Sequence, residues 1–106
     1  MPAAGADVNG EKLTALVRRI TADVLMVAPD RVKPESALVN DLGAESIDFL
    51  DLLFRIEEAL GEKLGADRWQ KFMAQRLAGK DIGKELTVAL VIQFAAETRA
   101  AIAGGD

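Results

Sequence analysis

The chain has 106 residues, half of them apolar, and a formal net charge of −4, which suits one domain with a modest core. It contains no cysteine and no histidine, so disulfides, thiolate metal sites, cysteine nucleophiles and histidine bases are excluded. The acidic balance disfavours nucleic-acid binding, for which a basic stripe is typical.

The first residues, up to about Val8, are small and polar, and we expect residues 1–8 to be disordered. They lack the basic region and apolar core of a signal peptide. The aliphatic runs of the chain are far too short to span a bilayer, so a cytoplasmic location is expected. We predict a single domain over residues 9–103, followed by frayed residues 104–106.

The first predicted helix begins near Asn9, which can cap it. It ends before Pro29, because the residue preceding a proline avoids the α conformation. Apolar residues at helical spacing mark its inward face: Leu13, Leu16, Val17, Ile20, Val24 and Val27. Residues 29–45 then form a long loop, and such loops are usually functional or disordered. Four apolar side chains can anchor the loop on the core: Val32, Leu38, Val39 and Leu42.

The second predicted helix runs from about Ser46 to Leu60, and Gly61 is placed to end it with a positive φ. Five apolar residues are predicted to form its inward stripe: Ile47, Leu50, Leu53, Phe54 and Leu60. Residues 41–62 hold seven acids and one base, a net of −6. Such a local field favours association with a basic partner.

Residues 63–85 have the opposite balance, with six bases and three acids and a net of +3. A stripe at helical spacing predicts a further helix over about Arg68–Ala78, with Asp67 as N-cap and Gly79 near its end. The stripe consists of Trp69, Phe72, Met73 and Leu77. The basic residues can be a solvated face, a shield for the acidic patch or a contact for an anionic lipid precursor.

Residues 80–85 are expected to be a connector, and the last helix is predicted over Leu86–Ile102 with Thr87 as its N-cap. The sequence therefore predicts an all-α fold. We expect a four-helix bundle with an extra or lengthened helix between the second helix and the C-terminal helix.

Ser46 falls where the long loop becomes the second helix. An exposed hydroxyl there lies above the free N–H groups of the first turn and the positive end of the helix dipole. That position suits an anionic group such as a phosphodiester. A lone serine at a helix start is more often a simple N-cap, so its neighbours decide the interpretation.

Those neighbours resemble the prosthetic-group attachment motif of acyl carrier proteins, Asp-x-Gly-x-Asp-Ser-Leu. They read Asp41-Leu42-Gly43-Ala44-Glu45-Ser46-Ile47-Asp48. Glu45 stands in place of the usual Asp and Ile47 in place of the usual Leu, and these swaps keep charge and apolarity. In that family the serine carries 4′-phosphopantetheine on its hydroxyl, so the resemblance implies the same for Ser46. The family's acidic recognition positions fall on Glu45, Asp48, Asp51, Glu57 and Glu58.

The resemblance is close over residues 29–61 and implies an acyl-carrier-like bundle that is a carrier and not an enzyme. Acyl thioesters would be presented on the arm to enzymes of fatty-acid or lipid biosynthesis. The implied partners are a phosphopantetheinyl transferase, which supplies the arm, and acyl synthases and acyltransferases with basic patches. A monomer is expected. The lack of histidine and cysteine fits a carrier of this kind, because the nucleophile would be the thiol of the arm and not a side chain.

After Gly61 the family pattern is stretched. The chain is similar there to extended carriers used for very-long-chain acyl groups of lipid A, which share a Trp-containing stretch after the second helix. The first interpretation of the stripe that contains Trp69 is that it packs in the hydrophobic core. A sharper hypothesis is an enlarged acyl pocket, since each buried CH₂ contributes roughly 0.8 kcal/mol. Its expected lining is Ile47, Leu50, Phe54, Trp69, Phe72, Met73, Leu90 and Phe94.

Two other functions remain open. A carrier of amino-acid or polyketide units shares the serine, but its second helix is typically less uniformly acidic. An unmodified interaction module would keep the acidic helix for docking alone. A carboxylate-dependent hydrolase is disfavoured, because the spacing places no paired carboxylates in a cleft.

Overall fold

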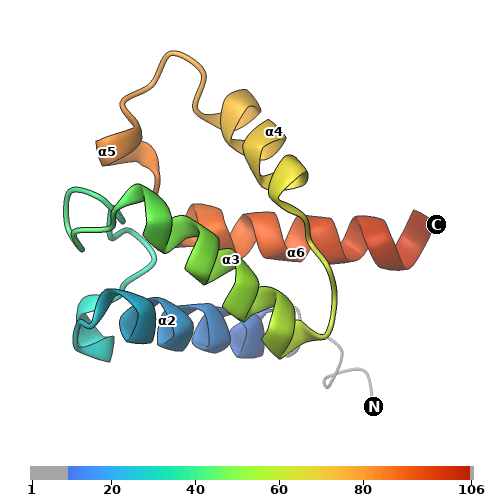
Figure 1. Cartoon of the computed structure of the whole chain (residues 1–106), viewed down its shortest axis with the longest axis horizontal. Coiled ribbons are helices and arrows are strands. Elements are labelled where there is room, and N and C mark those ends of the chain that lie inside the picture. The colour runs from blue at the N-terminus through green and yellow to red at the C-terminus, as the bar shows by residue number, and fades with distance from the viewer. Residues whose placement is uncertain (1–9, 106) are drawn as a thin grey trace.

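The computed structural model describes residues 10–105 (Figure 1). The expected disorder of residues 1–8, the cap at Asn9 and the end at Asp106 lie outside the described residues. Within them the helices are α2 (Glu11–Leu25), α3 (Ser46–Leu60), α4 (Ala66–Arg76), α5 (Ile82–Glu85) and α6 (Val88–Gly105), with a 3-10 turn at Pro29–Arg31. The prediction of an all-α bundle with an extra helix before the C-terminal one is confirmed.

α2 is the common support of the bundle, because it packs against both α3 and α6. In Figure 1, α2 lies along the bottom, α3 crosses in front of it, and α6 runs between α2 and α4. α4 packs against α6. Along residues 10–105 there is no helix with the length and apolar character needed to cross a membrane.

The long loop after α2 is fixed to the core as predicted. Val32, Leu38 and Leu42 are buried, and the Arg18 side chain of α2 donates a hydrogen bond of 2.6 Å to the Val32 carbonyl. α2 itself ends ahead of Pro29, at Leu25, and its C-cap Met26 takes a left-handed φ of 57°. The loop is therefore an ordered part of the domain.

The inward face of α3 differs from the predicted one. Leu53 is buried and Leu60 half-buried, but Ile47, Leu50 and Phe54 point to solvent. The core side is formed by Leu52, Leu53 and Ile56, with Phe49 half-buried beside them. Two apolar stripes at helical spacing run along this helix, and the longer one, which also includes Leu60, faces the core. The predicted stripe mixed the two.

The segment between α3 and α6 contains two helices where one was predicted. α4 starts two residues earlier than expected, with Gly65 at the N-cap and Asp67 in the first turn. The supposed connector of residues 80–85 holds the single turn α5, where the Asp81 carboxylate accepts the Gly83 N–H at 3.0 Å. One-turn helices have too few residues to show a periodic pattern.

The C-terminal helix confirms its predicted cap, since the Leu90 N–H donates to the Thr87 hydroxyl at 3.3 Å. α6 continues through Gly104 and Gly105, so its end lies beyond the predicted Ile102 and includes two residues expected to fray. Near its middle, Glu97 accepts hydrogen bonds of 2.9 and 2.8 Å from the Arg76 guanidinium of α4.

This ion pair gives the contact between α4 and α6 a dependence on pH. The hydrogen bond from Arg76 lowers the pKa of the Glu97 carboxyl below its ordinary value, against a weaker opposing effect of burial. Because the folded-state pKa is the lower one, the stabilisation is present above the unfolded-state pKa and is lost as pH falls through the folded-state pKa.

We therefore expect wild type to exceed Glu97→Gln in unfolding free energy by less than about 1 kcal/mol at neutral pH, as is usual for an exposed pair. The difference should vanish in the acid range below the folded-state pKa. Urea unfolding of both proteins across this range measures it. A difference that stays constant with pH would contradict the assignment.

Candidate functional site

The loop that precedes α3 is held by backbone hydrogen bonds to the segment that precedes α6. The Leu38 N–H donates to the Leu86 carbonyl at 2.9 Å. The Asn40 N–H donates to the Gly83 carbonyl at 3.3 Å. A Cβ at Gly83 would lie 2.6 Å from the Asn40 side-chain oxygen, so a larger residue here would have to displace the Asn40 amide. The loop that leads into α3 is thereby held against α5 and the residue that follows it.

The residues just before Ser46 form a tight turn whose side chains alternate between the core and solvent. The Asp41 carboxylate accepts the Ala37 N–H at 2.8 Å and closes the turn. Gly43 has a φ of +76°, which a residue with a side chain adopts only under strain. Leu42 and Ala44 are buried. The turn is thus anchored through alternate residues, and the chain leaves it towards solvent at the start of α3.

Ser46 is the first residue of α3 and is exposed. Among the described residues its hydroxyl makes no side-chain hydrogen bond. Glu45 precedes it in an extended conformation, and its N–H donates to the Asp48 carboxylate at 2.8 Å. Ser46 is therefore not needed as a cap, and its hydroxyl lies free at the positive end of a 15-residue helix, where an anionic group is favoured.

The chain has one other serine, Ser36, and its surroundings are the opposite. Ser36 is 8% exposed. Its hydroxyl accepts the Lys33 N–H and donates to the Arg31 carbonyl, both at 3.1 Å. Only Ser46 therefore presents a serine hydroxyl to another molecule.

The five acidic residues predicted for partner recognition fall into two groups. Two are half-buried and bind backbone N–H groups within the chain: Asp48 and Glu57. Three are exposed along α3 and its N-cap, with Asp51 also 3.0 Å from the Arg55 guanidinium. We call these three the acidic rim: Glu45, Asp51 and Glu58. A capping-box pattern, with an acid three residues after the N-cap, is the sequence signal that identifies the role of Asp48.

The Glu57 side chain stabilises the turn after α3 by accepting backbone hydrogen bonds. One of its carboxylate oxygens accepts the N–H groups of Leu64 and Gly65 at 2.9 and 2.8 Å. These hydrogen bonds fix the chain as it leaves Gly61, whose φ of 69° ends the helix as predicted. The entry into α4 therefore depends on an acid that resembles a surface recognition residue in the sequence.

Replacing Glu57 by alanine should lower the unfolding free energy by about 1.5–3 kcal/mol, the usual contribution of hydrogen bonds to a charged group. Glu57→Gln keeps an acceptor oxygen and should retain most of that stability. Glu58→Ala, at an exposed neighbour, should stay within about 0.5 kcal/mol of wild type. Urea unfolding compares the three variants. Equal stabilities of Glu57→Ala and Glu58→Ala would show that the two hydrogen bonds contribute nothing.

An exposed apolar stripe runs along α3 beside Ser46 and the acidic rim. Its members are Ile47, Leu50 and Phe54, which are 71%, 54% and 65% exposed. Side chains three and four positions apart share one helix face. Three large apolar residues aligned in this way are more typical of a contact surface than of scattered surface residues.

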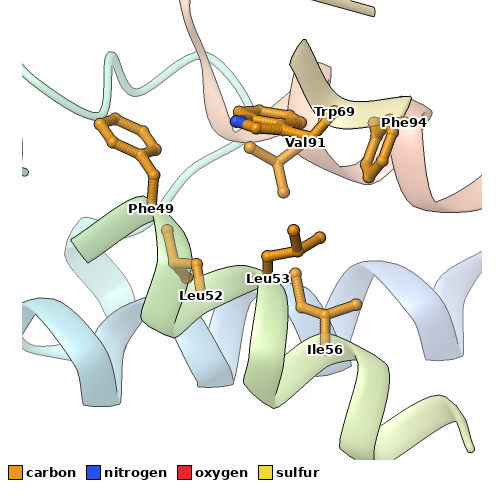
Figure 2. Close-up of a pocket in the computed structure, with 7 residues that line it drawn as sticks. All are labelled: Phe49, Leu52, Leu53, Ile56, Trp69, Val91 and Phe94. Atoms are coloured by element: carbon orange, nitrogen blue, oxygen red, sulfur yellow. The ribbon is translucent and has the colours of Figure 1, made fainter. Parts of the chain in front are cut away.

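The core side of α3 faces a small apolar cavity, which we call the central cavity (Figure 2). Figure 2 shows Leu52, Leu53 and Ile56 rising from α3 towards Trp69, Val91 and Phe94, with Phe49 at one end. Its free volume is about 10 Å³, which is room for about one water molecule. Its lining is entirely apolar.

Of the residues predicted to line an acyl pocket, Trp69 and Phe94 border the central cavity. Ile47, Leu50 and Phe54 do not border it, because they lie on the exposed stripe. Phe72 is buried and Met73 and Leu90 half-buried, but none borders the central cavity. The lining residues that were missed are Phe49, Leu52, Leu53, Ile56 and Val91. The four on α3 have the spacing i, i+3, i+4 and i+7, which is the signal that identifies an inward helix face.

Comparisons with known proteins agree with this geometry. The family described as "Phosphopantetheine attachment site" matches residues 15–68, a span that includes Ser46. The chain is 35% identical over 65 residues to "Acyl carrier protein AcpXL" of Mesorhizobium japonicum, covering 61% of this chain and 70% of that protein. It is 40% identical over 57 residues to "Acyl carrier protein" of Nitratidesulfovibrio vulgaris, covering 54% and 75%.

A further relative is "Acyl carrier protein AcpXL" of Brucella melitensis, 40% identical over 53 residues. That alignment covers 50% of this chain and 57% of the relative. No solved structure matches the chain.

Proposed function

Because this chain belongs to the acyl carrier protein family, whose members bear a 4′-phosphopantetheine group, we propose that Ser46 is the residue that carries it. The observation that supports this most directly is the contrast between the two serines. Ser46 is exposed at the start of α3, whereas Ser36 is buried and hydrogen-bonded. When bound, the group supplies a thiol that holds an acyl chain as a thioester.

The residues around Ser46 fit such a group. The free N–H groups of the first turn of α3 favour a phosphate there. Asp48 keeps the helix start in place by accepting the Glu45 N–H. The loop hydrogen bonds to Leu86 and Gly83 fix the position from which the arm extends. The chain itself then acts as a substrate of enzymes and supplies no catalytic group.

We propose that partner enzymes dock on α3. The acidic rim attracts basic patches on a phosphopantetheinyl transferase, acyl synthases and acyltransferases, and it mainly raises the rate of association. The exposed stripe of Ile47, Leu50 and Phe54 then supplies apolar area to bury, and buried apolar contacts stabilise the complex once it has formed. The two features lie side by side with Ser46, so docking brings the partner to the arm.

The central cavity is the proposed shelter for the acyl chain. It is apolar, and Phe49 at its end lies three residues from Ser46 on the same helix. The cargo we favour is a long acyl chain for lipid A, because the extra helix α4 brings Trp69 to this cavity. A shorter fatty acyl chain is the less specialised cargo that the same proposal allows. An aminoacyl or polyketide unit is the alternative cargo, and its polar groups fit an apolar cavity less well.

The test is incubation with coenzyme A and a phosphopantetheinyl transferase, followed by intact mass and peptide mapping. We expect a mass increase of one phosphopantetheine group, located on the peptide that contains Ser46. An unchanged mass with several such transferases would instead support an unmodified interaction module. Mass spectrometry of the protein isolated from its native host would then identify the cargo.

A further inference from the structure

Two apolar hollows share the Trp69 side chain in their lining. The first is the central cavity. The second is a surface groove of about 300 Å³, which we call the α4–α5 groove, and ligand pockets commonly start at roughly this size. Gln70 is its one polar side chain, and the rest of its lining is Trp69, Met73, Ala74, Leu77, Ala78 and Ile82. Trp69 is the one residue that lines both hollows.

We propose that Trp69 is a movable partition between these hollows, and that the α4–α5 groove receives the distal end of a long aliphatic chain carried on Ser46. Trp69 would then determine which chain lengths the protein shelters fully. This inference rests on the proposed function, because it needs the cargo to be tethered at Ser46.

The size of the central cavity makes movement of a side chain necessary. With about 10 Å³ free, it holds no part of an acyl chain unless a lining side chain shifts. Five of its seven lining residues are buried, and the two half-buried ones are Phe49 and Trp69. Their rings stack on each other, with centroids 6.5 Å apart and planes 24° apart. Because they are partly exposed to solvent, these two aromatic rings are the lining side chains that can move out of the cavity wall.

The two rings lie at different ends of the path. Phe49 is on α3, three residues after Ser46, so its displacement opens the cavity towards the tether. Trp69 is on α4 and borders the α4–α5 groove, so its displacement joins the two hollows. In Figure 2 the indole lies between Phe49 and Phe94, across from Leu52 and Leu53. A chain that enters past Phe49 therefore meets Trp69 next.

The contacts of Trp69 set a threshold of chain length. The indole packs edge-on to Phe94, with centroids 5.1 Å apart, and stacks on Phe72 at 6.4 Å. Displacing it loses these aromatic contacts, which a short chain does not offset. Each further methylene buries more apolar surface, so beyond a certain length displacement becomes favourable. The part of a long chain that passes Trp69 can then bury apolar surface of the α4–α5 groove. This surface includes Ile82, which is 45% exposed in the absence of cargo.

The first test uses the fact that Trp69 is the one tryptophan of the chain. Full-length protein is loaded at Ser46 with hexanoyl, dodecanoyl or octadecanoyl phosphopantetheine from the corresponding acyl coenzyme A. We expect the hexanoyl protein to have the same Trp69 emission and the same acrylamide quenching as the protein that carries the arm alone. Both signals should change abruptly at a longer chain and be different in the octadecanoyl protein. Emission that is the same at every length, or that changes equally at every length, would overturn the partition.

The second test places a carboxylate in the groove without touching the central cavity. Ile82→Glu does this, and Met26→Glu is the matched control, because Met26 is an exposed apolar residue outside the groove, 89% exposed. Binding of the cargo to the folded state raises the thermal midpoint. We expect Ile82→Glu to remove the extra rise given by octadecanoyl over hexanoyl, and Met26→Glu to keep it. Equal behaviour of the two variants would overturn the inference.

The two proposals fail in distinguishable ways. A chain that accepts no phosphopantetheine would reject the proposed function before any cargo is compared. A chain that loads normally, but whose Trp69 signal ignores cargo length, would reject the partition alone and leave the carrier function intact.

Discussion

Replacing Ser46 by alanine should abolish loading by a phosphopantetheinyl transferase and leave the unfolding free energy within about 0.5 kcal/mol of wild type. The hydroxyl is exposed and, among the described residues, makes no side-chain hydrogen bond. Its removal therefore leaves no polar group unpaired. Alanine is also a better helix former than serine. Intact mass after incubation with coenzyme A measures the first effect, and urea unfolding measures the second.

Ser36→Ala is the matched control and should give the opposite result. It removes a buried hydroxyl that joins the Lys33 N–H to the Arg31 carbonyl, so we expect a loss of about 1–3 kcal/mol. The variant should still load one phosphopantetheine, because Ser46 is untouched. Loading of Ser46→Ala, or loss of loading in Ser36→Ala, would move the attachment site away from position 46.

The largest expected loss of stability comes from Phe94→Ala. Phe94 is 2% exposed on α6, and its ring packs edge-on against Trp69 and Phe72 of α4, at 5.1 and 5.3 Å between centroids. Truncating a buried phenylalanine typically lowers stability by about 3–5 kcal/mol. Small domains have only about 5–15 kcal/mol in total, so the variant should be close to unfolding at room temperature.

Phe54→Ala provides the control with the same change of side chain. Phe54 is 65% exposed on α3, so its truncation should change the unfolding free energy by no more than about 0.5 kcal/mol. It should instead weaken binding to partner enzymes, since it shortens the exposed apolar stripe. Urea unfolding compares the two variants. Comparable losses in both would mean that Phe54 is also part of the core.

Local signals along the chain predict the helix that carries the candidate site. The turn residues before Ser46, the acid-rich run after it and the glycine at Gly61 define both ends of α3, and the structure places the helix at Ser46–Leu60. The Thr87 cap of α6 is predicted in the same way, from a hydroxyl before an apolar run. Each of these features depends on neighbours a few residues apart.

The face of α3 that enters the core depends on the rest of the fold. Both apolar stripes have helical spacing, and only packing against the other helices of the core distinguishes the buried Leu52 and Ile56 from the exposed Leu50 and Phe54. Glu57 likewise resembles Glu58 in the sequence. Its bonds to Leu64 and Gly65 arise because the chain turns back after Gly61.

The pairing of the loop before Ser46 with Leu86 and Gly83 joins two stretches that are distant in sequence. Both α3 and α4 lie in the chain between those stretches. The hydrogen bonds that hold the loop before Ser46 therefore come from residues outside α4. A change in the length of α4 can leave these hydrogen bonds, and with them the position of Ser46, unchanged.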